Sequence, residues 1–136
     1  MGYHWADVES YEYEEREPKP GETAPRRAAD ITTLASLQGS RARLWRYPAR
    51  TTGRRHRDHI QEEGFVVISG TLTMLLGDDP VERVDLGPGS VVAVEPMTPL
   101  QIRNETDEEL VVYVYGTPPV REGADFLDEV TLPPKP

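Results

Sequence analysis

Beyond residue 40, glycine, proline and aspartate divide the chain into short apolar runs, and this pattern strongly constrains the fold. The runs are rich in valine, leucine, isoleucine, tyrosine and threonine, which are typical of strands. Gly70 permits a sharp bend between two runs because glycine tolerates positive φ, and no segment there has a convincing helical period. The expected strands are 41–47, 64–69, 71–76, 81–86, 90–95, 99–103 and 110–115. Seven short strands at this spacing predict an all-β sandwich or small barrel.

A length of 136 residues fits a single domain. We place the barrel at 28–120, between an acidic arm at 1–27 and a tail at 121–136. The arm carries many charges and two closely spaced prolines without a sustained period. Residues 28–38 fit either a short helix or an extended segment, and their two threonines favour the extended form. In the tail we expect one helical turn over residues 124–128.

The charge distribution restricts the partners of this chain. Its net charge is -9, which argues against nucleic acid, although nine of its fifteen basic residues lie within residues 26–59. That arginine-rich stretch either pairs with the acidic arm or a second subunit, or forms an anion-binding surface. No apolar run is long enough to span a bilayer, so we expect no membrane partner. The chain has no cysteine, which excludes thiolate chemistry and is compatible with the cytoplasmic location that we expect.

Two stretches resemble a known family. HRDHIQEEGFVVISGTLTMLLGD (56–78) and LGPGSVVAVEPMTPLQIRN (86–104) are similar to the two conserved motifs of the cupin superfamily. The matching positions are Glu63, Phe65, Gly70, Gly89 and Asn104. The resemblance covers roughly residues 41–115 and implies a cupin jelly-roll β-barrel, also called a double-stranded β-helix, whose interior holds one divalent metal.

The chain departs from the family at its metal ligands. In metal-bearing cupins, the first motif supplies two histidines one residue apart and a glutamate, and the second motif supplies a third histidine. The position of that third histidine is Leu100, which cannot bind metal, and the glycine usually found three residues earlier is Met97. We therefore expect the metal site to be either lost or remodelled.

The first motif can be aligned in two registers. A regular strand running back from Glu63 directs Arg57 and His59 inward, whereas an intervening bulge directs His56 and Asp58 inward. Either register brings one histidine to Glu63. We favour His56, Asp58 and Glu63, because the other set places a guanidinium at a ligand position and because residues 56 and 61–63 match a common cupin variant. The expected cofactor is none, or one weakly bound divalent metal such as Mn, Fe, Zn or Ni.

Several other side chains are candidates for the cavity or its mouth. Arg54, Arg55 and Arg57 flank the histidines and can hold a carboxylate or phosphate, or form salt bridges with nearby acidic residues. Trp45 and Tyr47 fit either a binding wall or the core. The residues that we expect to contact a ligand are Arg55, Arg57, His59, Gln61, Phe65, Met74, Met97 and Leu100.

These features favour a cupin-type binding protein for a small organic ligand, and the arginines favour an anionic one. The alternative is a metal-dependent cupin enzyme of the dioxygenase, decarboxylase or isomerase type that uses His56, Asp58 and Glu63. The sequence assigns no catalytic residue. We also expect a homodimer, because unpaired sheet edges favour pairing between subunits.

Overall fold

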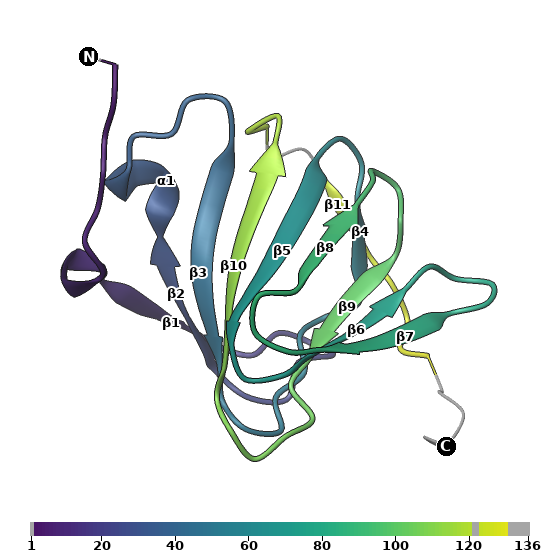
Figure 1. Ribbon diagram of the computed structural model, residues 1–136. Coiled ribbons are helices and arrows are strands. Elements are labelled where there is room, and N and C mark those ends of the chain that lie inside the picture. The colour runs from purple at the N-terminus through teal and green to yellow at the C-terminus, as the bar shows by residue number, and fades with distance from the viewer. Residues whose placement is uncertain (1, 121–122, 131–136) are drawn as a thin grey trace.

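The computed structural model describes residues 2–120 and 123–130, and two antiparallel sheets dominate it (Figure 1). The first sheet has the order β1 (Tyr13–Arg16), β2 (Arg26–Asp30), β3 (Arg41–Tyr47), β10 (Leu110–Thr117), β5 (Glu62–Ser69) and β8 (Val91–Val94). The second has the order β11 (Ala124–Phe126), β4 (His56–Asp58), β9 (Leu100–Arg103), β6 (Leu72–Leu76) and β7 (Glu82–Leu86). A 3-10 helix (Val8–Ser10) and α1 (Ile31–Leu34) complete the elements. The predicted all-β jelly roll is confirmed.

The strands expected from the apolar runs are β3 and β5 to β10. The bounds of β3 are as predicted, and those of the other strands differ by one or two residues at one or both ends. The bend at Gly70 is also present, with φ at +80°. A Cβ atom at Gly70 would lie 2.5 Å from the carbonyl oxygen of Glu109, so both the conformation and the close backbone approach require glycine.

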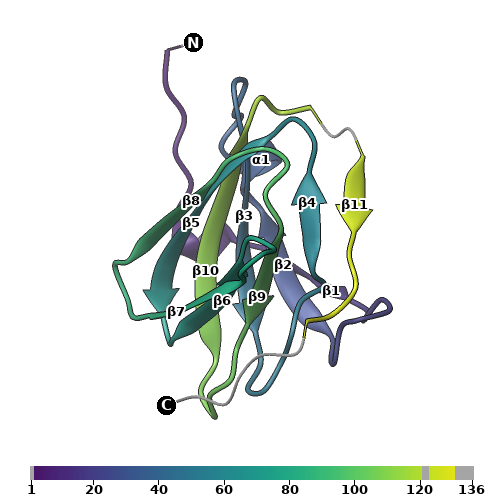
Figure 2. The same cartoon turned by 90° about the vertical axis from the view of Figure 1, so that its right-hand side faces the viewer.

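Described segments before and after the predicted strands also form strands, which the sequence does not indicate. Strands β1 and β2 extend the first sheet, so the expected boundary between arm and barrel falls within β2. The segment expected to be extended at 28–38 instead enters α1 after Asp30, whose side chain accepts a hydrogen bond from the Thr33 amide. The helical turn expected near residues 124–128 is the strand β11, which lies beside β4 (Figure 2). Strands β1 and β2 extend one edge of the first sheet, and β11 extends one edge of the second. An open sheet edge supplies hydrogen-bond partners that a local sequence pattern does not reveal.

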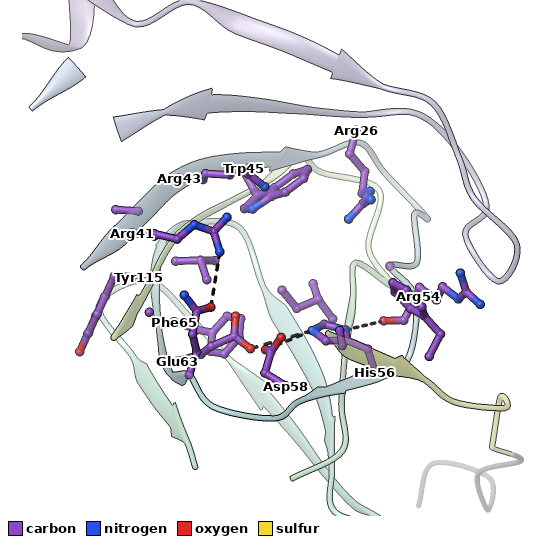
Figure 3. Close-up of a pocket in the computed structure, with 18 of the residues that line it drawn as sticks. Arg26, Arg41, Arg43, Trp45, Arg54, His56, Asp58, Glu63, Phe65 and Tyr115 are labelled. Carbon is purple, nitrogen blue, oxygen red and sulfur yellow. Dashed lines mark hydrogen bonds and ion pairs between the residues drawn. The ribbon is translucent and has the colours of Figure 1, made fainter. Parts of the chain in front are cut away.

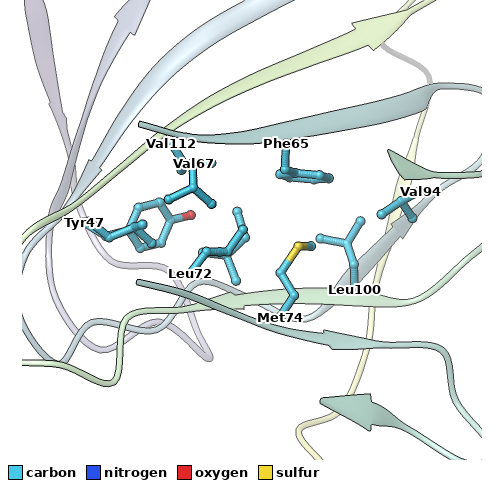
Figure 4. Packing of buried hydrophobic residues seen from close by; sticks show 10 residues of the cluster. Tyr47, Phe65, Val67, Leu72, Met74, Val94, Leu100 and Val112 are labelled. Carbon is cyan, nitrogen blue, oxygen red and sulfur yellow. The ribbon is translucent and has the colours of Figure 1, made fainter. Parts of the chain in front are cut away.

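The core lies between the sheets. Phe65, Val67 and Val112 extend from the first sheet toward Leu72, Met74 and Leu100 of the second (Figure 4). All six are almost fully buried, which makes this cluster the main hydrophobic contribution to folding. A second cluster packs α1 and the N-terminal segment on β3 and β10 through Ile31, Leu44 and Val111. Among the described residues, no helix is long and apolar enough to cross a membrane.

Candidate functional site

A cavity of about 400 Å³ opens beside the core between the two sheets (Figure 3). Trp45 of β3 and Phe65 of β5 line it from the first sheet. His56 and Asp58 of β4 line it from the second. The segment before β2 and the strand β11 add further walls, which makes this pocket the natural candidate for a binding site.

Three potential metal ligands converge in this pocket. The Nε2 atom of His56 lies 3.8 Å from an Asp58 carboxylate oxygen and 3.9 Å from Oε1 of Glu63. One ligand atom from each residue lies within 4.8 Å of the others. These are the residues of the favoured register. The strand is interrupted at residues 59–61, where the chain passes from β4 in the second sheet to β5 in the first, and this interruption resets the alternation of side chains.

A backbone contact orients the imidazole of His56. Its Nδ1 lies 3.0 Å from the carbonyl oxygen of Arg54. A carbonyl can only accept, so Nδ1 donates, and in the neutral imidazole Nε2 then carries the lone pair. That lone pair is directed at the two carboxyl groups, as metal-binding histidines require.

Glu63 is the most perturbed acid of the site. Burial, a hydrogen bond to Asp58 and the charge of Asp58 raise the pKa of Glu63 to about 9, while the charge of Arg41 acts in the opposite direction. Glu63 therefore carries a proton at neutral pH. Its Oε1 atom is buried and has no hydrogen-bond partner among the described residues. Because three electron-rich groups face one another, the site needs either a proton or a cation between them.

The rest of the pocket is rich in cations. Its basic lining residues are Lys19, Arg26, Arg41, Arg43 and Arg54. Arg26 is neutralised, because it forms a 2.6 Å ion pair with Glu22 and donates to the hydroxyl of Tyr47 at 2.9 Å. Arg54 stacks on Phe126, with its guanidinium carbon 3.8 Å from the ring centroid.

The residues expected to contact a ligand lie partly in the pocket, partly in the core and partly at the surface. Gln61 and Phe65 line the pocket, and the Gln61 amide donates to the carbonyl of Pro118. Met74 and Leu100, expected at the cavity, instead fill the core and are at most 1% exposed. Met97 is 48% exposed and does not line the pocket. Its φ of +66° is left-handed, which explains why cupins usually have glycine there.

The remaining expected contacts face away from the pocket. Arg55 is buried, and it pairs with Asp78 and donates to the carbonyls of Gly77 and Asp128. Arg57 and His59 both contact the Asp125 carboxylate, at 2.8 and 3.0 Å. Hydrogen bonds from Arg57 and His59 lower the pKa of Asp125. Arg55, Arg57 and His59 thus hold the segment around Asp125 and Asp128 against the barrel, and they do not line the pocket as the sequence had placed them.

Of the three arginines that flank the histidines, Arg54 lines the pocket, because it shares the two-residue spacing of His56 and Asp58. Sequence reasoning did not select several other lining residues. Arg26 and Phe126 reach the pocket only because distant chain segments fold over it, and no local pattern indicates this.

A two-sheeted jelly roll with a polar site inside the barrel defines the class of protein. The family model described as Cupin domain matches residues 43–116, and the chain belongs to this family. Four of the pocket's charged lining residues precede the matched region, namely Lys19, Glu22, Arg26 and Arg41. No curated protein matches the chain.

Solved structures share the fold at low identity. The polyketide cyclase RemF from Streptomyces resistomycificus is 15% identical, with a TM-score of 0.76 over 93% of this chain and 86% of that one. A sugar phosphate isomerase from Silicibacter pomeroyi is 21% identical, with a TM-score of 0.72 over 90% and 81%. A predicted oxalate decarboxylase from Thermotoga maritima is 12% identical, with a TM-score of 0.71 over 86% and 98%. These likenesses establish the fold.

The residues present fit a divalent cation. His56, Asp58 and Glu63 offer one nitrogen and two carboxyl ligands in a compact group, and the buried Oε1 atom of Glu63, which has no hydrogen-bond partner among the described residues, is free to be one of these ligands. An ion held there would act as a Lewis acid on a bound substrate. The arrangement thus could hold a metal, with a single imidazole among its ligands.

Proposed function

We propose that this protein binds a small organic anion in the barrel pocket. The observation that carries the proposal is the charge of the lining. A chain with net charge -9 places five of its fifteen basic residues around one cavity. Such clustering in an acidic protein concentrates positive potential where a ligand enters.

The acids of the pocket cancel only part of this charge. Glu63 is neutral at pH 7, and Glu22 is engaged by Arg26. Asp58 is the remaining acidic residue in the lining. The cavity is also large enough for a small metabolite and has apolar walls, as ligand pockets usually do.

Thermal shifts at low ionic strength test the proposal. Small carboxylates and phosphate esters should raise the melting temperature progressively with concentration, because they bind the folded chain. Their neutral amides and alcohols should not, and high salt should suppress the effect.

Two arginine variants localise the effect. Arg41→Gln removes a lining charge and should weaken the stabilisation, whereas Arg50→Gln removes an exposed charge that pairs with Asp107 and should leave it unchanged. Equal stabilisation by anions and their neutral analogues would contradict the proposal.

A second function is favoured by the buried Oε1 atom of Glu63, which has no hydrogen-bond partner within the part of the chain that the structure describes. The pocket would then be the active site of a metal-dependent enzyme of the dioxygenase, decarboxylase or isomerase type, with His56, Asp58 and Glu63 as ligands. Arg54 would hold His56 through its carbonyl, and the cationic lining would orient an anionic substrate.

Metal analysis tests this second function. Protein purified without added metal should contain Mn, Fe, Zn or Ni, or be stabilised by one of them. His56→Asn should abolish both the metal content and the stabilisation by added metal. His59→Asn is the matched control and should change neither, because His59 contacts Asp125 outside the pocket. Less than about a tenth of an equivalent of metal, with no stabilisation by added ions, would exclude the enzyme of this type.

A further inference from the structure

Aromatic side chains are concentrated in the pocket. Both phenylalanines of the chain and one of its two tryptophans line it. Phe126 is 51% exposed even though it belongs to the lining, so its ring offers apolar surface that the folded chain leaves uncovered. Trp45 lies across the pocket from His56 and Asp58 (Figure 3). A flat ring entering the pocket would therefore meet aromatic surfaces.

Two arginines stack on these rings, and they differ in their remaining partners. The guanidinium carbon of Arg26 lies 4.7 Å from the Trp45 ring centroid, but its charge is already paired with Glu22. Arg54 lies over Phe126 and forms no ion pair with the residues that the structure describes. Stacking holds the plane of a guanidinium and leaves its edge, where the N–H donors lie, open to an anion.

The acidic residues of the pocket favour a ligand with a single negative charge over one with two. Asp58 and Glu63 both line this part of the pocket beside His56, so a dianionic phosphate would be repelled more strongly than a carboxylate. A carboxylate also matches the two parallel donors of one guanidinium.

We infer that the ligand is an aromatic carboxylate, with its carboxylate on the edge of Arg54 and its ring against Phe126 and Trp45. This inference rests on the proposed anion binding and names the ligand class. It also assigns specificity to β11, because Phe126 lies beyond the matched cupin region.

Calorimetric titration with three probes of similar shape tests the inference. The probes are 2-naphthoate, its saturated analogue decahydro-2-naphthoate, and the neutral 2-naphthamide. We expect 2-naphthoate to bind about ten-fold more tightly than the saturated acid. Both acids bury a similar apolar area, but only the aromatic ring gains the additional stabilisation of ring–ring contacts with Phe126 and Trp45. We expect the amide to bind at least about ten-fold more weakly than 2-naphthoate, because it lacks the charge-assisted contact.

Three variants assign the contacts. Phe126→Leu should weaken 2-naphthoate about five-fold and leave the saturated acid unchanged, since only the ring contact is lost. Arg54→Gln should weaken both acids, and Arg50→Gln should weaken neither. Circular dichroism and melting temperatures would verify that each variant folds, and Phe126 is exposed enough for its replacement to be tolerated.

The outcomes separate the two proposals. Equal affinity for the two acids, with the amide weaker, overturns the aromatic ligand and leaves anion binding in place. If 2-naphthoate does not bind but other anions stabilise the protein, the aromatic ligand is likewise overturned and anion binding is left in place. Undiminished binding by Arg54→Gln overturns the assignment of Arg54. Binding of the amide as tightly as the acid contradicts anion binding itself.

Discussion

His56 and Leu100 are directly opposed in the pairing of β4 with β9. Opposed residues in an antiparallel pair project their side chains to the same face of the sheet. Leu100 therefore stands where a third imidazole would face His56, as the alignment with the cupin motifs implies. Because Leu100 is 1% exposed and packs in the core, the chain uses this position for apolar packing.

Leu100→His should bring a second imidazole to the site and tighten Zn²⁺ or Ni²⁺ binding by about ten-fold or more. The metal-free variant should be about 2–4 kcal/mol less stable, because a polar ring replaces a buried leucine. Added metal should recover part of that loss. Leu100→Asn is the control, since it introduces polarity without imidazole. Metal titrations followed by melting temperature measure both effects, and equal affinity in the two variants would contradict the assigned geometry.

Glu63 should make stability depend on pH. Its pKa is about 9 in the folded chain and near the ordinary 4.5 when unfolded, so between these values only the folded state keeps the proton. The free energy of unfolding should fall as pH rises through this window, by at most about 1.4 kcal/mol per pH unit from this group. Glu63→Gln should remove that contribution, giving a flatter profile in urea titrations from pH 5 to 9. Parallel profiles would show that Glu63 is not buried as a neutral acid.

Gly70 and Gly89 offer a matched pair of substitutions. Both have positive φ, +80° and +87°, so alanine should cost about 1 kcal/mol at either position from backbone strain. At Gly70 the added Cβ would also meet the Glu109 carbonyl at 2.5 Å, whereas at Gly89 it meets nothing within 4 Å. We expect Gly70→Ala to lower the free energy of unfolding by about 2 kcal/mol more than Gly89→Ala. Urea unfolding measures the difference, and equal losses would argue against the close approach.

The expected homodimer stays a prediction. Ile68 and Val91, on β5 and β8, are 52% and 60% exposed on the outer face of the first sheet, opposite to the core-facing Val67 and Val92. We propose that a second copy covers this face. Sedimentation should then give the mass of two chains, and Ile68→Glu should give that of one. A wild-type mass of one chain would contradict the proposal.

The sequence by itself determined most strands of the barrel, although not β4. Apolar runs and turn residues located β3 and β5 to β10, because alternation and chain-breaking residues act locally. The two motifs also favoured His56, Asp58 and Glu63 over the register with Arg57 and His59, and they revealed leucine at position 100, since spacing along neighbouring strands limits which side chains can meet.

The tertiary structure decided what surrounds these residues. Arg57 and His59 look like pocket residues in the sequence, but β11 pairs with β4 and supplies Asp125 on the opposite face. Arg26 and Phe126 come from segments far from the motifs and gain their place through sheet extension at both ends of the chain. Such contacts depend on which edge a strand joins, and no local periodicity encodes that choice.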